Sequence, residues 1–260
     1  MAYFVWIAAL ILIIVYGSRI LEKRWPIAPV PQSDFQDDWL AVIISLCLAY
    51  SLNPLTSITS ATILSYTGVG WIPLPIDTYW QWGLSLAVVV LVTDLFKYSV
   101  HRLRHVVPIF WELHSFHHSA PGLTFITGAR HLWIERVIDN GFLPLMVVLF
   151  QVPPNMVGAI GIIFFLPDGC AHLNVRFPMG RFITWINTPQ WHRIHHSVQP
   201  EHHDKNFAAL LPLWDILFGT AWIPAPDEYP DTGLMPTERA DIVNTIIWPF
   251  RHLRRKHATS

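Results

Sequence analysis

The stretch that decides the fold runs from residue 101 to 118 and reads HRLRHVVPIFWELHSFHH. Its last five residues return as a pattern at 192–196, HRIHH, so the spacing HxxHH occurs twice. Side chains three and four positions apart share one face of a helix, so each box presents its imidazoles towards one point. His101 and His105, four residues apart, form a third group. We therefore expect helices whose ends bring histidines together.

These histidines point to a metal site. The clustered ones are His101, His105, His114, His117, His118, His192, His195 and His196. Imidazoles with few acids suit iron, zinc, copper or nickel rather than calcium or magnesium. One zinc ion takes about three or four protein ligands, so this number of imidazoles favours two metal ions. Lone histidines such as His131 and His252 are interpreted as polar caps.

The composition is that of a membrane protein. The chain has 260 residues, of which 52% are hydrophobic and 13% charged, against about 25% charged in a soluble domain. A net charge of -1 gives no basic field for nucleic acid. Cys47 and Cys170 both lie in apolar stretches and predict no disulfide framework. All 14 histidines follow residue 100, so the chain divides into an anchor half and a chemistry half.

Apolar segments predict spans at about 2–17, 39–71, 79–100, 133–152 and 155–171. Basic residues follow the first span, so we expect its end to be cytoplasmic. Because successive spans cross the membrane in alternating directions, the histidines and the basic tail at 251–256 are expected on this same side. The segment 39–71 is interpreted as one bent span, because two spans would separate the early basic loop from the histidines. Pro153 and Pro154 predict a sharp turn between the last two spans, which form a hairpin.

The predicted fold is an all-α integral membrane protein, multi-pass, with about four to five transmembrane helices. A cytosolic helical cap carries the histidine boxes. Residues 1–78 are expected to be N-terminal anchor helices, 79–221 the catalytic domain and 222–260 a cytosolic tail.

Longer motifs surround the boxes. They are DLFKYSVHRLRH at 94–105, HSFHHS at 114–119, HLNV at 172–175, TPQWHRIHHS at 188–197, DKNF at 204–207 and LWDILFGT at 213–220. Together they resemble the membrane fatty acid hydroxylase and sterol desaturase superfamily, over about residues 80–221. Two positions depart from that pattern: Ala208 replaces a usual glycine, and Arg176 stands where fatty acid 2-hydroxylases place another histidine. Both favour the sterol desaturase-like branch.

The resemblance implies a di-iron centre that uses O2 as co-substrate. The eight box histidines are then the catalytic metal ligands, and His172 is a ninth ligand. It also implies a helical membrane domain whose active site faces the cytosol. A lipid C–H bond has no acidic proton and no leaving group, so its oxidation needs an oxidant made from O2, for which iron is suited and redox-inactive zinc is not. We expect hydroxylation or desaturation of a lipid such as a sterol or fatty acyl chain.

Electrons are expected from a separate donor, either a cytochrome b5-like protein or a ferredoxin with its reductase. Alternative substrates are a carotenoid or an alkane. A zinc hydrolase or isomerase is a rival interpretation, although the chain contains neither HExxH nor Gly-x-Ser-x-Gly. A metal-transport or metal-binding membrane protein is a second rival. It would carry ionisable groups along several spans, whereas these histidines gather at one end.

Some polar residues are candidates for supporting roles. Four acids could orient the imidazoles: Asp94, Asp168, Asp204 and Asp215. Asp94 stands out because a carboxylate within an apolar span is costly. Asn206 and Arg193 are expected to hold loops or a polar substrate group, and residues 214–220 to pack the C-terminal cap.

Overall fold

The computed structural model describes residues 2–52, 54, 62, 65, 66, 68, 70–139, 146, 149–234, 243, 245–248 and 250. Within these residues all regular structure is helical, and β pairing is limited to three isolated bridges. The helices are α1 (Ala2–Arg24), α2 (Gln32–Ser51), α4 (Tyr79–Val106), α5 (Pro108–His118), α6 (Trp133–Asp139), α8 (Pro154–Ala171), α9 (Pro189–His195) and α10 (Leu213–Phe218). Short 3-10 turns are η1 (Phe125–Ala129), η2 (Gly180–Phe182) and η3 (Pro200–His202). The all-α expectation is confirmed for this part of the chain.

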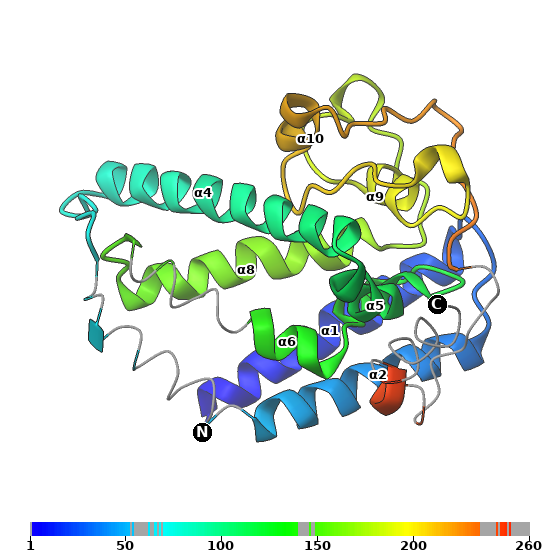
Figure 1. Ribbon diagram of the computed structural model, residues 1–260, viewed down its shortest axis with the longest axis horizontal. Coiled ribbons are helices and arrows are strands. Elements are labelled where there is room, and N and C mark those ends of the chain that lie inside the picture. Colours follow the sequence, from blue (N-terminus) through cyan, green and yellow to red (C-terminus); the bar gives the residue numbers. More distant parts are fainter. Residues whose placement is uncertain are drawn as a thin grey trace.

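Two long helices, α4 and α8, lie side by side and run in the same direction (Figure 1). A capping box at Thr78 and Gln81 starts α4, and Pro154 at the first helical position starts α8. Val89 and Met156, both fully buried, pack between them. Both helices therefore end at the same end of the molecule, where α5 and α9 also lie.

Among the residues that can be described, one helix is long and apolar enough to cross a membrane. It is α4, and the apolar segment Asn155–Ala171 is shorter. The expected span 2–17 forms the first part of α1, which continues to Arg24. Most of 53–69 and of 140–148 lies outside the described residues, so the number of spans remains a prediction.

The expected helix at 133–152 is wrong at its C-terminal end. Residues 151–153 are not helical, and Phe150 forms a parallel bridge with Ile72. The Gln151 N–H donates to the Ile72 carbonyl at 3.0 Å. Because a residue that precedes proline disfavours the helical conformation, the Pro153-Pro154 pair extends the chain before α8 begins.

The two N-terminal helices are bonded directly to the histidine-bearing part. The Phe125 N–H donates to Glu22 of α1 at 2.7 Å. The Thr127 hydroxyl donates to Asp38 of α2 at 2.8 Å. Asp38 also pairs with the buried guanidinium of Arg130 at 2.9 Å. Both carboxylates are almost fully buried, so α1 and α2 contribute to the core that supports the site.

Candidate metal centre

The structure brings the nine predicted histidines into two neighbouring groups. The five-histidine group is His101, His105, His114, His118 and His195, and the four-histidine group is His117, His172, His192 and His196. Within each group the candidate ligand atoms lie within 4.8 Å of one another. Four separate stretches of chain contribute to them: the end of α4, α5, the residue after α8, and α9 with its cap.

A sharp reversal after α4 places the first two stretches against each other. Pro108 begins α5 only two residues after α4 ends, since proline fits the first turn of a helix but not its interior. The ring centroids of His101 and His114 are then 5.0 Å apart, and those of His105 and His118 are 4.8 Å apart. The close repeat of histidines along 101–118 thereby becomes one wall of the five-histidine group.

Each HxxHH box serves both groups. His114 and His118, four residues apart, face the five-histidine group, while His117 between them faces the other. In α9 the pattern is reversed, because the outer pair joins the four-histidine group and His195 the five-histidine group. Thr188 starts this short helix by accepting the Trp191 N–H at 3.1 Å. A box of this spacing is thus suited to two adjacent metal ions.

The outward ring nitrogens are held by backbone carbonyls. His101 Nδ1 donates to Phe207 O and His195 Nδ1 to Lys205 O, both at 2.8 Å. His172 Nδ1 donates to Asp168 O at 2.7 Å, a carbonyl in the last turn of α8, where helical acceptors lack intrahelical partners. A carbonyl only accepts, so these bonds place the proton on Nδ1 and leave Nε2 as a lone pair.

The inward nitrogens fit a bound cation. His117 Nδ1 lies 3.3 Å from the Arg130 carbonyl, so His117 and His172 share this tautomer. Their Nε2 atoms nevertheless face each other at 3.2 Å. Two facing lone pairs repel unless a cation binds both. In the five-histidine group the Nε2 atoms of His101, His114 and His195 are buried and have no hydrogen-bond partner among the described residues. The nitrogen donor set suits iron, zinc, copper or nickel alike.

Burial keeps these imidazoles neutral. It lowers the pKa of His114 to about 3, although the neighbouring Glu135 carboxylate acts in the opposite direction. Burial, followed by the adjacent imidazoles, holds the pKa of His117 and His196 well below the usual value. A neutral imidazole is the form that binds a metal ion, so the site is ready for metal at neutral pH.

The loop at 204–208 supplies two of the carbonyls. Asp204 and Asn206 have positive φ angles of 58° and 57°, a left-handed conformation that asparagine and aspartate tolerate. The Asn206 amide donates to Trp191 O and Trp222 O, both at 3.0 Å, so it holds a loop as expected. Asp215 accepts the N–H groups of Phe207 and Ala208 at 2.8 and 2.9 Å.

The four predicted acids do different things. Asp94 contacts none of the histidines and instead accepts three N–H groups near α10. Asp168 contributes its carbonyl, with its carboxylate 3.8 Å from His172. An Asp204 oxygen lies 3.5 Å from His105 Nδ1, and Asp215 acts through the 204–208 loop. Arg193 donates to Pro230 O at 2.7 Å and so ties down a loop.

Two residues beside the histidine groups, Glu135 and His131, were not predicted from the sequence. Glu135, 2% exposed, accepts His114 Nδ1 at 2.9 Å. His131 was expected to be a polar cap, but its ring stacks on that of His117 at 4.4 Å. Glu135 is an acid at the start of an apolar stretch that follows the first HxxHH box. A carboxylate in such a stretch is costly, as it is for Asp94, and this signal could have identified Glu135.

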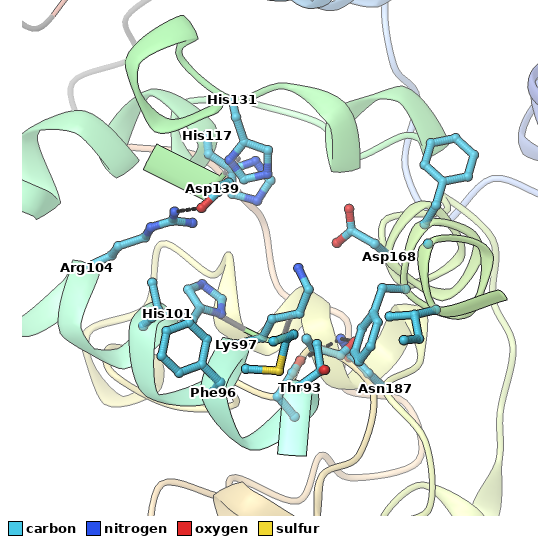
Figure 2. A pocket seen from close by; sticks show the side chains of 18 of the residues that line it. Thr93, Phe96, Lys97, His101, Arg104, His117, His131, Asp139, Asp168 and Asn187 are labelled. Carbon is cyan, nitrogen blue, oxygen red and sulfur yellow. Dashed lines mark hydrogen bonds and ion pairs between the residues drawn. The ribbon is translucent and has the colours of Figure 1, made fainter. Parts of the chain in front are cut away.

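A cavity of about 420 Å³ reaches the histidines between α4 and α8. Its wall includes His101, His114, His117 and His192, and its apolar lining is Phe96, Val100, Met146, Val152, Ile160, Phe164 and Phe165. Figure 2 shows the Arg104–Asp139 ion pair on one side and Asp168 on the other. The cavity thus borders both these apolar side chains and the imidazoles, and its wall also contains the charged residues Lys97, Arg104, Asp139 and Asp168.

A second cavity, also of about 420 Å³, reaches the five-histidine group beside residues of the 195–204 segment. Its lining includes His105, His118, His195 and the exposed Asp204. Trp111 lies there too, with its ring 4.9 Å from that of His105. The histidines can thus be approached through two differently lined openings.

Comparisons with known proteins place this arrangement in a family. Residues 86–220, just over half of the chain, match the fatty acid hydroxylase family. The chain belongs to this family. The matched region contains every histidine of both groups. No solved structure matches the chain significantly.

Relatives of this fatty acid hydroxylase family member include alkylglycerol monooxygenases from two organisms. The one from Xenopus tropicalis is 35% identical over 150 residues, which cover 57% of this chain and 32% of the relative. The one from Danio rerio is 32% identical over 162 residues, covering 62% and 35%. A very-long-chain aldehyde decarbonylase from Arabidopsis thaliana is 24% identical over 204 residues, covering 71% and 31%. The chain thus spans about a third of the length of these relatives, and they do not single out the sterol desaturase-like branch.

Replacing Gly128 with alanine is expected to weaken metal binding by the four-histidine group. The added Cβ would lie 3.0 Å from His172 Nδ1 and 3.2 Å from Asp168 O, beside the hydrogen bond that orients this ring. Loss of such an outer partner typically costs about 10–100-fold in metal affinity. Metal retention against a chelator measures the effect. Gly158→Ala is the control, because nothing lies within 4 Å of that position; equal retention in both variants contradicts the prediction.

Replacing Glu135 with glutamine is expected to lower metal affinity in the five-histidine group. The substitution keeps the size of the side chain but removes the negative charge that faces His114 Nδ1 at 2.9 Å. We expect a loss at the lower end of the range of about 10–100-fold for outer partners, measured by chelator competition. The exposed Glu201→Gln serves as the control. An unchanged affinity in Glu135→Gln would show that this carboxylate does not support the ring.

Proposed function

We propose that this protein is a membrane oxidoreductase that holds two iron ions on its nine clustered histidines and uses O2 to hydroxylate or desaturate a lipid. The observation that carries the proposal is the pair of largely buried histidine groups whose Nε2 atoms face inward beside a cavity with several apolar side chains in its wall. Membership of the fatty acid hydroxylase family supports it.

In this proposal the five-histidine group holds one ion and the four-histidine group the other. Bound iron supplies the redox chemistry by which O2 is activated. The chain's own residues prepare the site. Backbone carbonyls and Glu135 orient the rings, burial keeps them neutral, and the Phe96 and Phe164 side chains line an apolar path that excludes water from the substrate.

The membrane setting extends the proposal. We place the histidines on the cytosolic side of a multi-pass protein of about four to five spans. α4 and α8 both end at the histidines, and the basic residues after the first expected span assign that end to the cytosol. A separate electron donor, cytochrome b5-like or ferredoxin with its reductase, then approaches from the cytosol. The second cavity, where Trp111 packs on His105, is the side on which we place it.

The substrate in this proposal is an ether lipid of the alkylglycerol class. Two of the named relatives carry that activity in their names, and this favours an alkylglycerol over the sterol indicated by Ala208 and Arg176. In the structure Arg176 is exposed and stacks on Tyr229 at 5.1 Å, so this position adds no ligand to either histidine group. A carotenoid or an alkane remains the alternative.

The test is metal analysis together with turnover. The protein is purified into lipid nanodiscs, and its metal content, O2 consumption and lipid products are measured with hexadecylglycerol and a reduced donor. We expect about two iron ions per chain and an oxygenated or desaturated product. Bound zinc with no O2 consumption would support the hydrolase instead. Metal flux across proteoliposomes without lipid oxidation would support the transporter.

A further inference from the structure

We propose that Asn187 and Thr93 form a subsite that binds a hydroxyl group of the lipid substrate. Both residues line the cavity between α4 and α8, and each carries a buried polar atom without a hydrogen-bond partner among the described residues: Asn187 Oδ1 and Thr93 Oγ1. The inference rests on the proposed function, in which this cavity holds the lipid.

The Asn187 amide is fixed in orientation. Its Nδ2 donates to the carbonyls of Ala208 at 2.8 Å and Ala209 at 3.3 Å. Carbonyls accept only, so Nδ2 is the nitrogen and Oδ1 is the remaining acceptor. The residue is 6% exposed. A buried acceptor without a partner is costly, and a ligand that donates a hydrogen bond relieves that cost.

The backbone holds Asn187 next to the turn of α4 that bears Thr93. The Asn187 N–H donates to Leu210 O at 2.8 Å, and the Leu210 N–H donates to Asp94 at 2.9 Å. Asp94 follows Thr93 in the chain. In the view of Figure 2, Thr93 and Asn187 lie at the bottom of the cavity and His117 and His131 at the top. Thr93 precedes His101 by eight residues, about 12 Å along the helix.

The two atoms together specify the chemistry of the ligand. Asn187 Oδ1 can only accept a hydrogen bond, whereas the Thr93 hydroxyl can donate and accept. A lipid hydroxyl donates to the first and accepts from the second. A carboxylate, an ether or an ester oxygen offers only acceptors, which face the Asn187 oxygen unfavourably. The subsite therefore favours a neutral lipid with a free hydroxyl group, held at a fixed distance from the histidines.

The experiment measures binding rather than turnover. Radiolabelled 1-hexadecanol, hexadecyl methyl ether and palmitic acid are titrated onto the full-length protein in nanodiscs, with empty nanodiscs subtracted. Palmitic acid is included because Lys97 lines the same cavity. We expect the alcohol to bind about five- to tenfold more tightly than the methyl ether. Thr93→Val should remove most of that preference, whereas Thr93→Ser, which keeps the hydroxyl, should retain it.

Asn187→Leu should also remove the preference for the alcohol. If that variant fails to fold, Thr93→Val still decides, because Thr93 Oγ1 makes no hydrogen bond to any residue that the structure describes. Unchanged iron content in Thr93→Val shows that the metal site is intact. Equal binding of alcohol and methyl ether, tighter binding of palmitic acid, or a preference that survives in Thr93→Val would overturn the subsite. Failure of all three lipids to bind would overturn the subsite, whereas failure of hexadecylglycerol to bind as well would also overturn the proposed function.

Discussion

Replacing His192 with alanine is expected to abolish lipid oxidation and to lower bound iron from about two ions per chain to about one. His192 Nε2 lies 3.0 Å from His172 Nε2 and 3.2 Å from His196 Nε2, at the centre of the four-histidine group. Loss of a residue that only orients a ligand typically costs about 10–100-fold. Loss of a ligand should therefore reduce turnover by more than about a hundredfold. Iron analysis and product formation in nanodiscs measure the two effects.

His101→Ala provides the mirror experiment in the five-histidine group. It should cause the same loss of turnover while the four-histidine group keeps its ion. The control is His203→Ala, since His203 is exposed and belongs to neither group, and it should keep both iron ions. Full iron content in His192→Ala would refute the assignment of this residue as a ligand.

Replacing Asp94 with alanine is expected to lower the free energy of unfolding by about 3–5 kcal/mol. Its carboxylate, which is fully buried, accepts the N–H groups of Leu210, Leu211 and Trp214 at 2.9 to 3.1 Å. Alanine would leave three buried donors without an acceptor, and each such loss is costly. Denaturant titration of the protein in detergent measures the change.

Asp94→Asn should lower the free energy of unfolding by less, because the amide oxygen can still accept hydrogen bonds from some of these three N–H groups. The exposed Asp227→Ala is the control and should change stability by less than about 0.5 kcal/mol. If Asp94→Ala and Asp227→Ala unfold at the same denaturant concentration, the carboxylate does not hold the 210–214 segment to α4.

The sequence was sufficient to predict that the histidines converge, because that signal is local. The spacing of imidazoles within each box follows from the helical repeat, and helix ends at Val106 and Ala171 place the boxes together. The helical class follows from apolar length, as do the two long helices, which were expected at 79–100 and 155–171 and extend over 79–106 and 154–171. These features depend on neighbours in the chain, so a single sequence is enough to recognise them.

The supporting contacts could not be predicted in the same way. His101 pairs with Phe207 across 106 positions, and Thr127 pairs with Asp38 across 89. No spacing rule connects such residues. Asp94 was identified as unusual because a carboxylate in an apolar helix needs partners, but its partners became visible only in three dimensions. The extended residues 151–153 were missed because the turn chemistry of two prolines overrides an apolar pattern.

The carboxylates of Glu22 and Asp38 have a consequence for how this protein can be recombined. Glu22 accepts a hydrogen bond from Phe125, and Asp38 binds Thr127 and Arg130. Arg130 in turn donates to the carbonyl of Phe116, which lies within the first HxxHH box. A chimera that joins the histidine-bearing part of one homologue to helices α1 and α2 of another must therefore keep each acid together with the hydrogen-bond donors that it binds. Helices α1 and α2 are therefore not interchangeable membrane anchors, and exchanging them requires that Glu22 and Asp38 both be retained.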